Sequence, residues 1–217
     1  MRYAIGDVHG RPFWKNYLDD DFSAFYLVGD YFDTHGRGAD FKKQYGNFNE
    51  ICAAARKDRR LKLCLGNHDY HYLQGVRNQR YSGFQETRAP QIGRVLEDNL
   101  DLLNVVYVTE DRYLISHAGV TAWFLASIGG KKPEDINAAF RKDRNILNFN
   151  GFDPYGDDIT QSPIWVRPGA LREDPLPGYH QIAGHTPVRA ITEVDLNGGL
   201  NKLILIDTPG PGLVYRF

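Results

Sequence analysis

The chain has 217 residues, a formal net charge of −1, 42% hydrophobic residues and 24% charged residues. This length and composition are typical of one globular domain that buries a substantial core. The near-neutral charge offers no basic surface to nucleic acid and the apolar runs are too short to span a bilayer, so we expect neither nucleic acid nor membrane as a partner.

The first residues, Met1-Arg2-Tyr3-Ala4-Ile5, run directly into a polar motif. They contain neither the basic region nor the apolar region of a secretory signal, so we expect a cytoplasmic protein. Cys52 and Cys64 are the only cysteines, and both have apolar neighbours. Because thiols stay reduced in the cytosol, we expect two buried free cysteines and no disulfide.

The first third of the chain has the pattern of strands that alternate with helices. Short apolar runs at residues 3–5, 25–28 and 61–65 each end in Gly followed by a polar residue. Between the second and third runs, apolar residues recur at helical spacing over residues 41–55. This order predicts parallel strands that are joined by helices.

Two more helices and a different closing section are predicted further along. Apolar spacing indicates a helix over residues 92–103, and Pro133 followed by two acidic residues opens another over residues 133–147. Strand-like runs at residues 181–183, 193–196, 203–207 and 213–217 are separated by Gly, Pro and Asn. They predict a closing antiparallel section.

Residues 151–178 are rich in Pro, Gly and Asp and show little periodicity. A loop of this length in a compact domain is usually functional or poorly ordered. It carries the short apolar run Ile164-Trp165-Val166 followed by Arg167. We interpret this segment as a loop over the active site, with a solvated excursion as the alternative.

Five glycine-containing motifs hold residue types that bind metals, and most of them directly follow predicted strands. Four of the seven histidines lie in these motifs. Because ligands bind at the carboxyl ends of strands in an open α/β sheet, we expect the motifs to converge on one crevice. The motifs are Gly6-Asp7-Val8-His9-Gly10, Gly29-Asp30-Tyr31-Phe32-Asp33, Gly66-Asn67-His68-Asp69, Ser116-His117-Ala118-Gly119 and Gly184-His185-Thr186-Pro187.

The motif residues have the chemistry of a two-metal hydrolase site. Asp7 and His9 alternate in a segment that we expect to be extended, so both can bind one ion. Asp30 can bridge two cations with its two oxygens. Mixed oxygen and nitrogen ligands favour Mn, Fe or Zn over calcium, and we expect two divalent ions, with Mn preferred. The second ion would be completed by Asn67, His117 and His185.

Such a centre is suited to phosphoester hydrolysis. Two ions about 3.5–4 Å apart generate a hydroxide at neutral pH and stabilise an in-line displacement. His68 follows the candidate ligand Asn67, and Asp33 lies just beyond Asp30. An Asp–His pair beside the ions can supply the proton that the leaving group needs, and an arginine can hold the phosphoryl oxygens.

Each motif taken alone is a weak signal. Asp30 could cap a helix, and His68 could be a core histidine that a carbonyl satisfies. Five motifs in this order are not expected by chance. The remaining histidines have no motif around them and are interpreted as structural or surface residues; they are His35, His71 and His180.

Together the motifs resemble the phosphoprotein phosphatase branch of the calcineurin-like metallophosphoesterases. The similarity is greatest to small bacterial and phage members, which include serine/threonine phosphatases and symmetrical diadenosine-tetraphosphate hydrolases. It extends from Gly6 to Leu205-Ile206-Asp207-Thr208. The resemblance implies an α/β fold in one domain over residues 1–217, a two-sheet β-sandwich flanked by helices with a dimetal site at one edge.

The resemblance also implies roles for individual residues. One metal would be bound by Asp7, His9 and Asp30, and the other by Asp30, Asn67, His117 and His185. His68 would be the general acid, and Asp33 would orient it. The segment Trp165-Val166-Arg167 is similar to the one that supplies a phosphate-binding arginine in bacterial members.

Two departures from the family pattern bear on the substrate. The second motif usually continues Asp-Arg-Gly, with the arginine on phosphate, whereas this chain has Thr34 after Asp33. Arg37 or Arg11 would then substitute for that arginine, or His35 in a weaker form. The last motif lacks the second histidine that many phosphodiesterases and nucleases use, which favours the phosphatase branch.

The leading hypothesis is a phosphatase that hydrolyses phosphoesters by direct attack of a metal-bound hydroxide. We expect phosphoserine or phosphothreonine in a protein as the substrate, or a small phosphoester. A dinucleoside polyphosphate is the alternative, because paired basic groups and aromatic walls suit a nucleotide. A further alternative is an inactive metal-bound scaffold that uses residues 151–178 to bind a partner, although the intact His68 and Asp33 argue against it.

Overall fold

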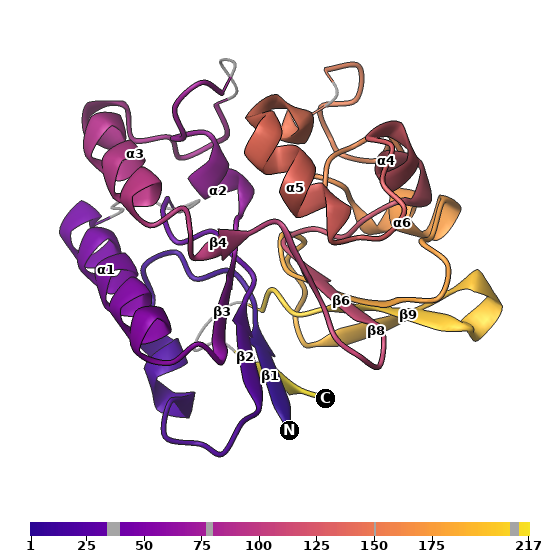
Figure 1. Ribbon diagram of the computed structural model, residues 1–217, viewed down its shortest axis with the longest axis horizontal. Coiled ribbons are helices and arrows are strands. Elements are labelled where there is room, and N and C mark those ends of the chain that lie inside the picture. The colour runs from indigo at the N-terminus through magenta and orange to yellow at the C-terminus, as the bar shows by residue number, and fades with distance from the viewer. Residues whose placement is uncertain (34–39, 77–79, 150, 209–212) are drawn as a thin grey trace.

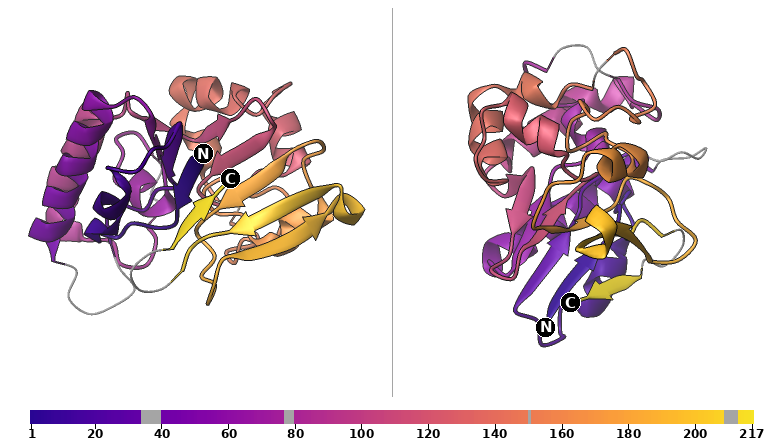
Figure 2. Two further views of the ribbon diagram at one scale, coloured as in Figure 1. Left: turned by 90° about the horizontal axis from the view of Figure 1, so that it is seen from below. Right: turned by 90° about the vertical axis from the view of Figure 1, so that its right-hand side faces the viewer.

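The computed structural model describes residues 1–33, 40–76, 80–149, 151–208 and 213–217. Two five-stranded sheets pack against each other, and helices cover their outer faces (Figures 1 and 2). The two ends of the chain lie side by side, and the Arg2 amide donates to the Phe217 carbonyl at 2.9 Å (Figure 1). The expected α/β fold of two sheets flanked by helices is confirmed.

The first sheet contains the predicted parallel strands in the order β10-β1-β2-β3-β4. Helix α1 (Phe41–Lys57) joins β2 to β3, and α3 (Ala89–Asp98) precedes β4, so both connections are of the βαβ type. The strands are β1 (Arg2–Ile5), β2 (Ala24–Leu27), β3 (Leu61–Cys64), β4 (Leu103–Asn104) and β10 (Val214–Arg216), and β10 pairs antiparallel with β1.

The second sheet is mixed, which corrects the expected antiparallel closing section. β7 runs parallel to both β6 and β9, whereas β5 and β8 form antiparallel edges. The long crossover between β6 and β7 lets β7 return in the direction of β6, and a hairpin then sets β9 parallel to β7. The strands are β5 (Val106–Val108), β6 (Tyr113–Ser116), β7 (His180–Ala183), β8 (Thr192–Leu196) and β9 (Asn201–Leu205).

Two of the predicted helices end earlier than expected. Helix α3 stops at Asp98, because the following apolar residues form β4 beside β3. Helix α5 (Asp135–Lys142) stops where Asp143 adopts φ −142°, and the Asp143 carboxylate then caps a 3-10 turn. The short helices are α2 (Asn67–Tyr70), α4 (Ala122–Ser127) and α6 (Pro168–Glu173), with 3-10 turns η1 (Pro12–Tyr17), η2 (Glu86–Arg88), η3 (Arg144–Leu147) and η4 (Asn197–Gly199).

The segment 151–178 is not a loop throughout, because it contains α6. Pro168 occupies the first turn of α6, where its missing N–H costs nothing. Ala170 and Leu171 are buried against the outer face of the second sheet. The apolar residues of this segment therefore anchor it to the sheet, which low periodicity did not indicate.

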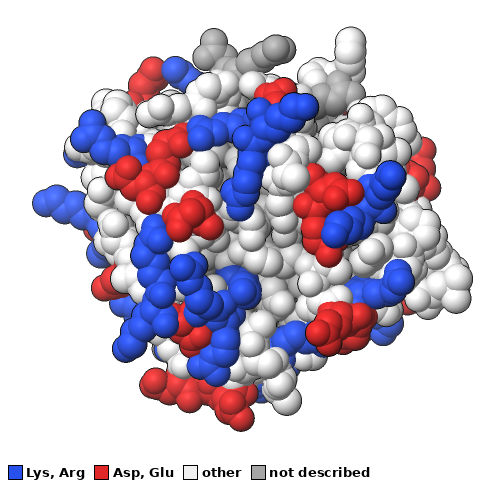
Figure 3. Space-filling view, in the orientation of Figure 1, with Lys and Arg blue, Asp and Glu red and all other residues white. Residues whose placement is uncertain are grey.

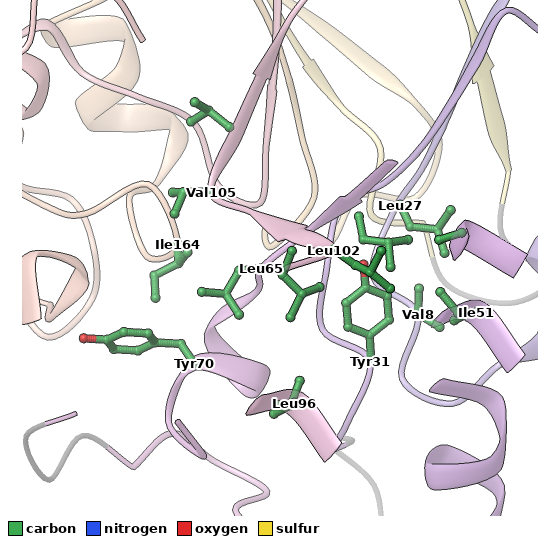
Figure 4. Close-up of a cluster of buried hydrophobic side chains, with 14 of the residues drawn as sticks. Val8, Leu27, Tyr31, Ile51, Leu65, Tyr70, Leu96, Leu102, Val105 and Ile164 are labelled. Atoms are coloured by element: carbon green, nitrogen blue, oxygen red, sulfur yellow. The ribbon is translucent and has the colours of Figure 1, made fainter. Parts of the chain in front are cut away.

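The cores lie on both sides of the first sheet. Side chains such as Ile51, Leu27 and Tyr31 pack between this sheet and its helices (Figure 4). A second cluster fills the space between the sheets, with Cys64 among its buried members. Cys52 and Cys64 are buried and free, as expected, and burial raises the pKa of the Cys52 thiol to about 12.

Two further observations concern the surface and the helices. Lys and Arg side chains lie among Asp and Glu side chains on the face in Figure 3, in keeping with totals of 26 and 27 in the sequence. Within the described ranges, the helices are too short and too polar to cross a membrane.

Candidate metal centre and active site

The five motifs meet where β1, β2, β3, β6 and β7 end. The motif residues Asp7, His9, Asp30, Asn67, His68 and His185 all line a cavity of about 540 Å³. His117 is fully buried directly behind them. Residues from positions 7 to 185 are therefore brought together, because the carboxyl ends of parallel strands from two sheets converge on one edge.

The six candidate ligands form one tight cluster. The Asn67 Oδ1 lies 2.8 Å from the His117 Nε2 and 3.1 Å from the His185 Nδ1. The His117 Nε2 is also 3.5 Å from the Asp30 Oδ2, and the His9 Nε2 is 3.9 Å from the Asp7 Oδ2. These contacts, with the 4.0 Å approach of the His117 Nδ1 to the Asp7 Oδ1, connect all six side chains.

Two of the imidazole rings, those of His9 and His117, turn an unprotonated nitrogen towards this cluster. The Nδ1 of His117 lies 2.9 Å from the Val28 carbonyl, and the Nδ1 of His9 lies 3.0 Å from the Phe32 carbonyl. A carbonyl accepts, so each Nδ1 carries the ring proton and each Nε2 keeps a lone pair. Burial lowers the pKa of His117 to about 4 and that of His185 well below its usual value, which keeps both rings neutral.

The carboxylates also fit a cation. Burial, together with the negative charges of Asp7 and Asp69, raises the pKa of Asp30 well above its usual value. Two buried carboxylates in one cluster repel each other unless a positive charge lies between them. Three hydrogen bonds to Asp69, from the amides of Asp30, Tyr31 and Gly66, hold the Asp30 backbone in place. Carboxylate oxygens, an amide oxygen and neutral imidazoles are ligands that Mn, Fe and Zn accept.

The backbone at the site is held in an uncommon conformation. Six non-glycine residues in the described ranges have positive φ, and four of them are at this site: His9 (45°), Asp30 (53°), Asp33 (61°) and His185 (59°). Such conformations cost roughly 1–3 kcal/mol each when they are strained. The segment from Asp7 to His9 is therefore not extended as expected; the chain turns at His9, and the turn brings its ring beside Asp7.

The motif glycines allow carboxylates to approach the backbone. A Cβ on Gly66 would collide with the Asp30 Oδ1, and a Cβ on Gly184 would collide with the Asp7 Oδ1. Gly29 has φ 110°, a backbone conformation that glycine adopts without the steric cost that a Cβ would add. Each aspartate therefore packs directly against the glycine of another motif, and these contacts fix the positions of the motifs relative to one another.

The predicted acid and its partner lie next to the cluster. The His68 Nδ1 is 3.1 Å from the Asp33 Oδ2, and both residues are buried. Burial raises the pKa of Asp33, but hydrogen bonds from His68, His71 and Tyr72 outweigh it and lower this pKa to about 2. Asp33 is therefore an ionised partner for the His68 ring at neutral pH.

His71 is a structural residue, one of the two roles expected for it, and it is not on the surface. Its buried Nε2 lies 2.8 Å from the same Asp33 oxygen as His68, a contact that the sequence analysis does not predict. The sequence did contain a signal, because residues three apart on a helix share a face, and His68 lies in α2 while His71 directly follows it.

Two of the three predicted arginines reach the cavity. The Arg167 Nη1 donates to the His185 carbonyl at 3.0 Å and to the Thr186 hydroxyl at 3.2 Å. Arg11 lines the cavity and donates to the Asp7 carbonyl at 2.5 Å and to the Val8 carbonyl at 3.2 Å. Arg37 and His35 lie outside the described residues.

Sequence reasoning also missed Asp207, Ser82 and Thr208, which line the cavity. Burial and the Asp7 charge raise the pKa of Asp207 to about 7, while the charges of Arg11 and Arg167 lower it. An available signal was the apolar run of β9, which ends at a polar Asp-Thr pair just as the other strands end at polar motifs. The polar pair after β9 is not preceded by the glycine that is present in the other motifs.

Comparison with known proteins agrees with this geometry. The calcineurin-like phosphoesterase family matches residues 3–191, and the chain belongs to this family. As a member it is a metal-dependent phosphoester hydrolase, and the family uses divalent metals. No curated protein sequence is significantly similar to the chain.

Solved structures share the fold. A mutant cold-active protein tyrosine phosphatase is 19% identical, with a TM-score of 0.60, and the match covers 95% of this chain and 70% of that one. A protein serine/threonine phosphatase from Saccharomyces cerevisiae, with similarity to human phosphatase PP5, is 16% identical with a TM-score of 0.52. That match covers 95% of this chain and 67% of the yeast chain.

The contact between Gly66 and Asp30 predicts the effect of one methyl group. In Gly66→Ala the new Cβ would collide with both the carboxylate and the backbone nitrogen of Asp30, so Asp30 must move. We expect affinity for Mn²⁺ to fall roughly 10- to 100-fold, as when support for a ligand is lost. Calorimetric titration of the metal-free variant with Mn²⁺ measures the change.

Gly46→Ala is the matched control. Gly46 is exposed in α1, and no heavy atom lies within 4 Å of the position that a Cβ would occupy there. We expect Mn²⁺ affinity to stay at the wild-type value, while the free energy of unfolding rises by about 0.5–1 kcal/mol. If Gly66→Ala also bound Mn²⁺ like the wild type, the position of the Asp30 carboxylate would not matter for the metal.

Proposed function

We propose that the six clustered side chains bind two divalent ions, with Mn²⁺ preferred. Asp30 would be shared between them. The ions would supply an activated water and neutralise phosphoryl charge. The neutral imidazoles and the close carboxylates described above support this assignment. The proposed ligands are Asp7, His9 and Asp30 for one ion, and Asp30, Asn67, His117 and His185 for the other.

His68 is the proposed general acid. Its Nδ1 faces the ionised Asp33 at 3.1 Å, which leaves Nε2 as the ring atom that can give a proton to the leaving oxygen. His68 lines the same cavity as the candidate ligands. Asp33 fixes the direction of the His68 ring, and an Asp–His pair beside the reacting group can supply the proton that the leaving oxygen needs.

Arg167 and Arg11 are the proposed phosphate-binding groups. Hydrogen bonds to backbone carbonyls hold both guanidinium groups at the cavity wall. A fixed guanidinium fork matches two phosphoryl oxygens and loses little freedom when it binds them. Trp165 and Arg167 both come from segment 151–178 and line the cavity, so we propose that this segment forms a wall over the site.

Phosphoserine or phosphothreonine in a protein is the proposed substrate. The observation that carries this proposal is the buried Asp33–His68 pair beside the ligand cluster. Serine and threonine leave as alkoxides, which are poor leaving groups and need a proton, whereas a nucleotide leaves as a stable phosphate and needs it much less. The yeast structure with the same fold is a protein serine/threonine phosphatase, which agrees with this choice.

A dinucleoside polyphosphate is the second candidate, and one observation favours it. The Trp165 ring lines the cavity and packs against Tyr81 with ring centroids 4.7 Å apart. An aromatic wall next to two arginines suits a nucleotide base and its phosphates. We do not propose the inactive scaffold, because the family is hydrolytic and the Asp33–His68 pair is hydrogen-bonded.

The proposed substrate order can be measured directly. With Mn²⁺ the protein should hydrolyse p-nitrophenyl phosphate, and chelation should abolish turnover. Under the same metal, kcat/KM should be higher for phosphoserine and phosphothreonine peptides than for diadenosine tetraphosphate. A higher value for the dinucleotide would make the second candidate the function, and no turnover with any divalent metal would overturn both.

Replacing the proposed acid should produce a leaving-group signature. His68→Asn removes the proton donor, so we expect kcat to fall by about 10²–10⁴-fold for phenyl phosphate, which has a poor leaving group. The loss for p-nitrophenyl phosphate should be much smaller, because nitrophenolate leaves without a proton. Steady-state kinetics with both esters tests this. Equal losses would remove His68 from the acid role.

Replacing the proposed phosphate ligand should weaken the productive complex. Arg167→Ala loses a charge-assisted hydrogen bond of about 1.5–3 kcal/mol, so kcat/KM should fall roughly 10- to 100-fold. Arg172→Ala, an exposed arginine on α6, is the control and should retain wild-type kinetics. If the two variants behaved alike, Arg167 would have no role in phosphate binding.

A further inference from the structure

The Asp33 carboxylate is shared by two imidazoles. Its Oδ2 lies 3.1 Å from the His68 Nδ1 and 2.8 Å from the His71 Nε2. Its Oδ1 accepts from the Tyr72 hydroxyl at 2.6 Å and from the Gln85 side-chain amide at 3.1 Å. Four donors therefore fix the plane and the rotation of this carboxylate.

The hydrogen bonds of His71 define which of its nitrogens carries the proton. The Tyr81 amide donates to the His71 Nδ1 at 3.1 Å, so this nitrogen is an acceptor. The proton of the neutral ring is then on Nε2, which faces Asp33. Burial lowers the pKa of His71, and this favours the neutral ring.

Aromatic rings fix the direction of the His71 ring. The ring centroid of Tyr72 lies 4.3 Å away at 87°, and that of Phe84 lies 4.9 Å away at 90°. Tyr81 stacks on His71 with centroids 5.4 Å apart. A ring packed in this way cannot turn its Nε2 away from Asp33 without disturbing three neighbours.

The tautomer also excludes a metal site at this position. Asp33, His68 and His71 place one potential ligand atom each within 4.8 Å of one another. However, the His71 Nε2 carries the proton, and a protonated imidazole nitrogen has no lone pair for a cation. The group is a hydrogen-bonded network and not a third coordination site.

We propose that His71 is a positioning residue for the general acid, because its Nε2–H holds the Asp33 Oδ2 where the His68 Nδ1 meets it. The inference rests on the proposed acid role of His68. Asp33 itself has φ 61°, so the backbone does not favour its placement and the side-chain donors must maintain it. Without His71, one of the two donors to Oδ2 is lost, while Tyr72 and Gln85 still donate to Oδ1. The Asp33 Oδ2 is then held less firmly against His68.

Two substitutions separate positioning from packing. His71→Met fills similar space without a donor, whereas His71→Gln keeps a side-chain N–H that can reach Asp33. We expect His71→Met to lower kcat for phenyl phosphate by about 10-fold, which is part of the 10²–10⁴-fold that an acid contributes. The change for p-nitrophenyl phosphate should stay below about 3-fold, with KM and Mn²⁺ affinity unchanged. His71→Gln should recover most of the loss.

The same kinetics distinguish failure of this inference from failure of the acid role. If His68→Asn shows no leaving-group dependence, the acid role itself is wrong. If His68→Asn shows it but His71→Met slows both esters equally, His71 only supports the fold. The double variant should lose no more than His68→Asn alone, because both changes act on one proton transfer; additive losses would overturn the proposal.

A measurement on the unmodified protein covers the case in which His71→Met does not fold. In ¹⁵N NMR spectra of the Mn-free protein, His71 should show a protonated Nε2 and an unprotonated Nδ1. Its Nε2–H proton should appear far downfield, as for a donor to a carboxylate. The opposite tautomer would leave Asp33 without this donor and would overturn the proposal.

Discussion

The arrangement of the candidate active site depends on the repulsion between two buried carboxylates, those of Asp7 and Asp30. Asp7 and Asp30 follow neighbouring parallel strands, and both are almost fully buried. Glycines let each carboxylate lie against the backbone of another motif, and the charges of Asp7 and Asp69 add to burial in raising the pKa of Asp30. Such an arrangement gains little from contacts within the protein alone. It would become favourable if the surrounding donors held divalent cations, because these supply the missing positive charge.

Hydrogen bonds hold the residues of this centre in backbone conformations that are uncommon for non-glycine residues. His9, Asp30, Asp33 and His185 adopt positive φ, so backbone preference does not place them. Hydrogen bonds do so instead: the Phe32 carbonyl accepts from His9, and the His185 amide donates to the Asp7 carboxylate. The apolar cluster between the sheets is closely packed, and this packing supports the strands from which the hydrogen-bonded residues extend.

Much of the first sheet and the candidate ligands could be predicted from local patterns. Apolar runs that end at Gly and a polar residue located β1, β2 and β3, and helical spacing located α1. The mixed second sheet could not be predicted in this way, because pairing direction depends on how distant segments cross over. The contact between His71 and Asp33 could not be predicted for a related reason, because the two residues are 38 positions apart in the sequence. The positive φ of His9 could not be predicted either, because the sequence of its motif also fits an extended segment.

The division of the candidate ligands between two sheets has a consequence for the lifetime of the protein. Asp7, Asp30 and Asn67 follow strands of the first sheet, whereas His117 and His185 follow strands of the second. An ion bound by both groups, as proposed, would resist sliding of one sheet over the other. Its contribution to stability grows as RT ln(1 + [M]/Kd), so metal supply would regulate how much folded protein survives proteolysis as well as how fast it turns over substrate.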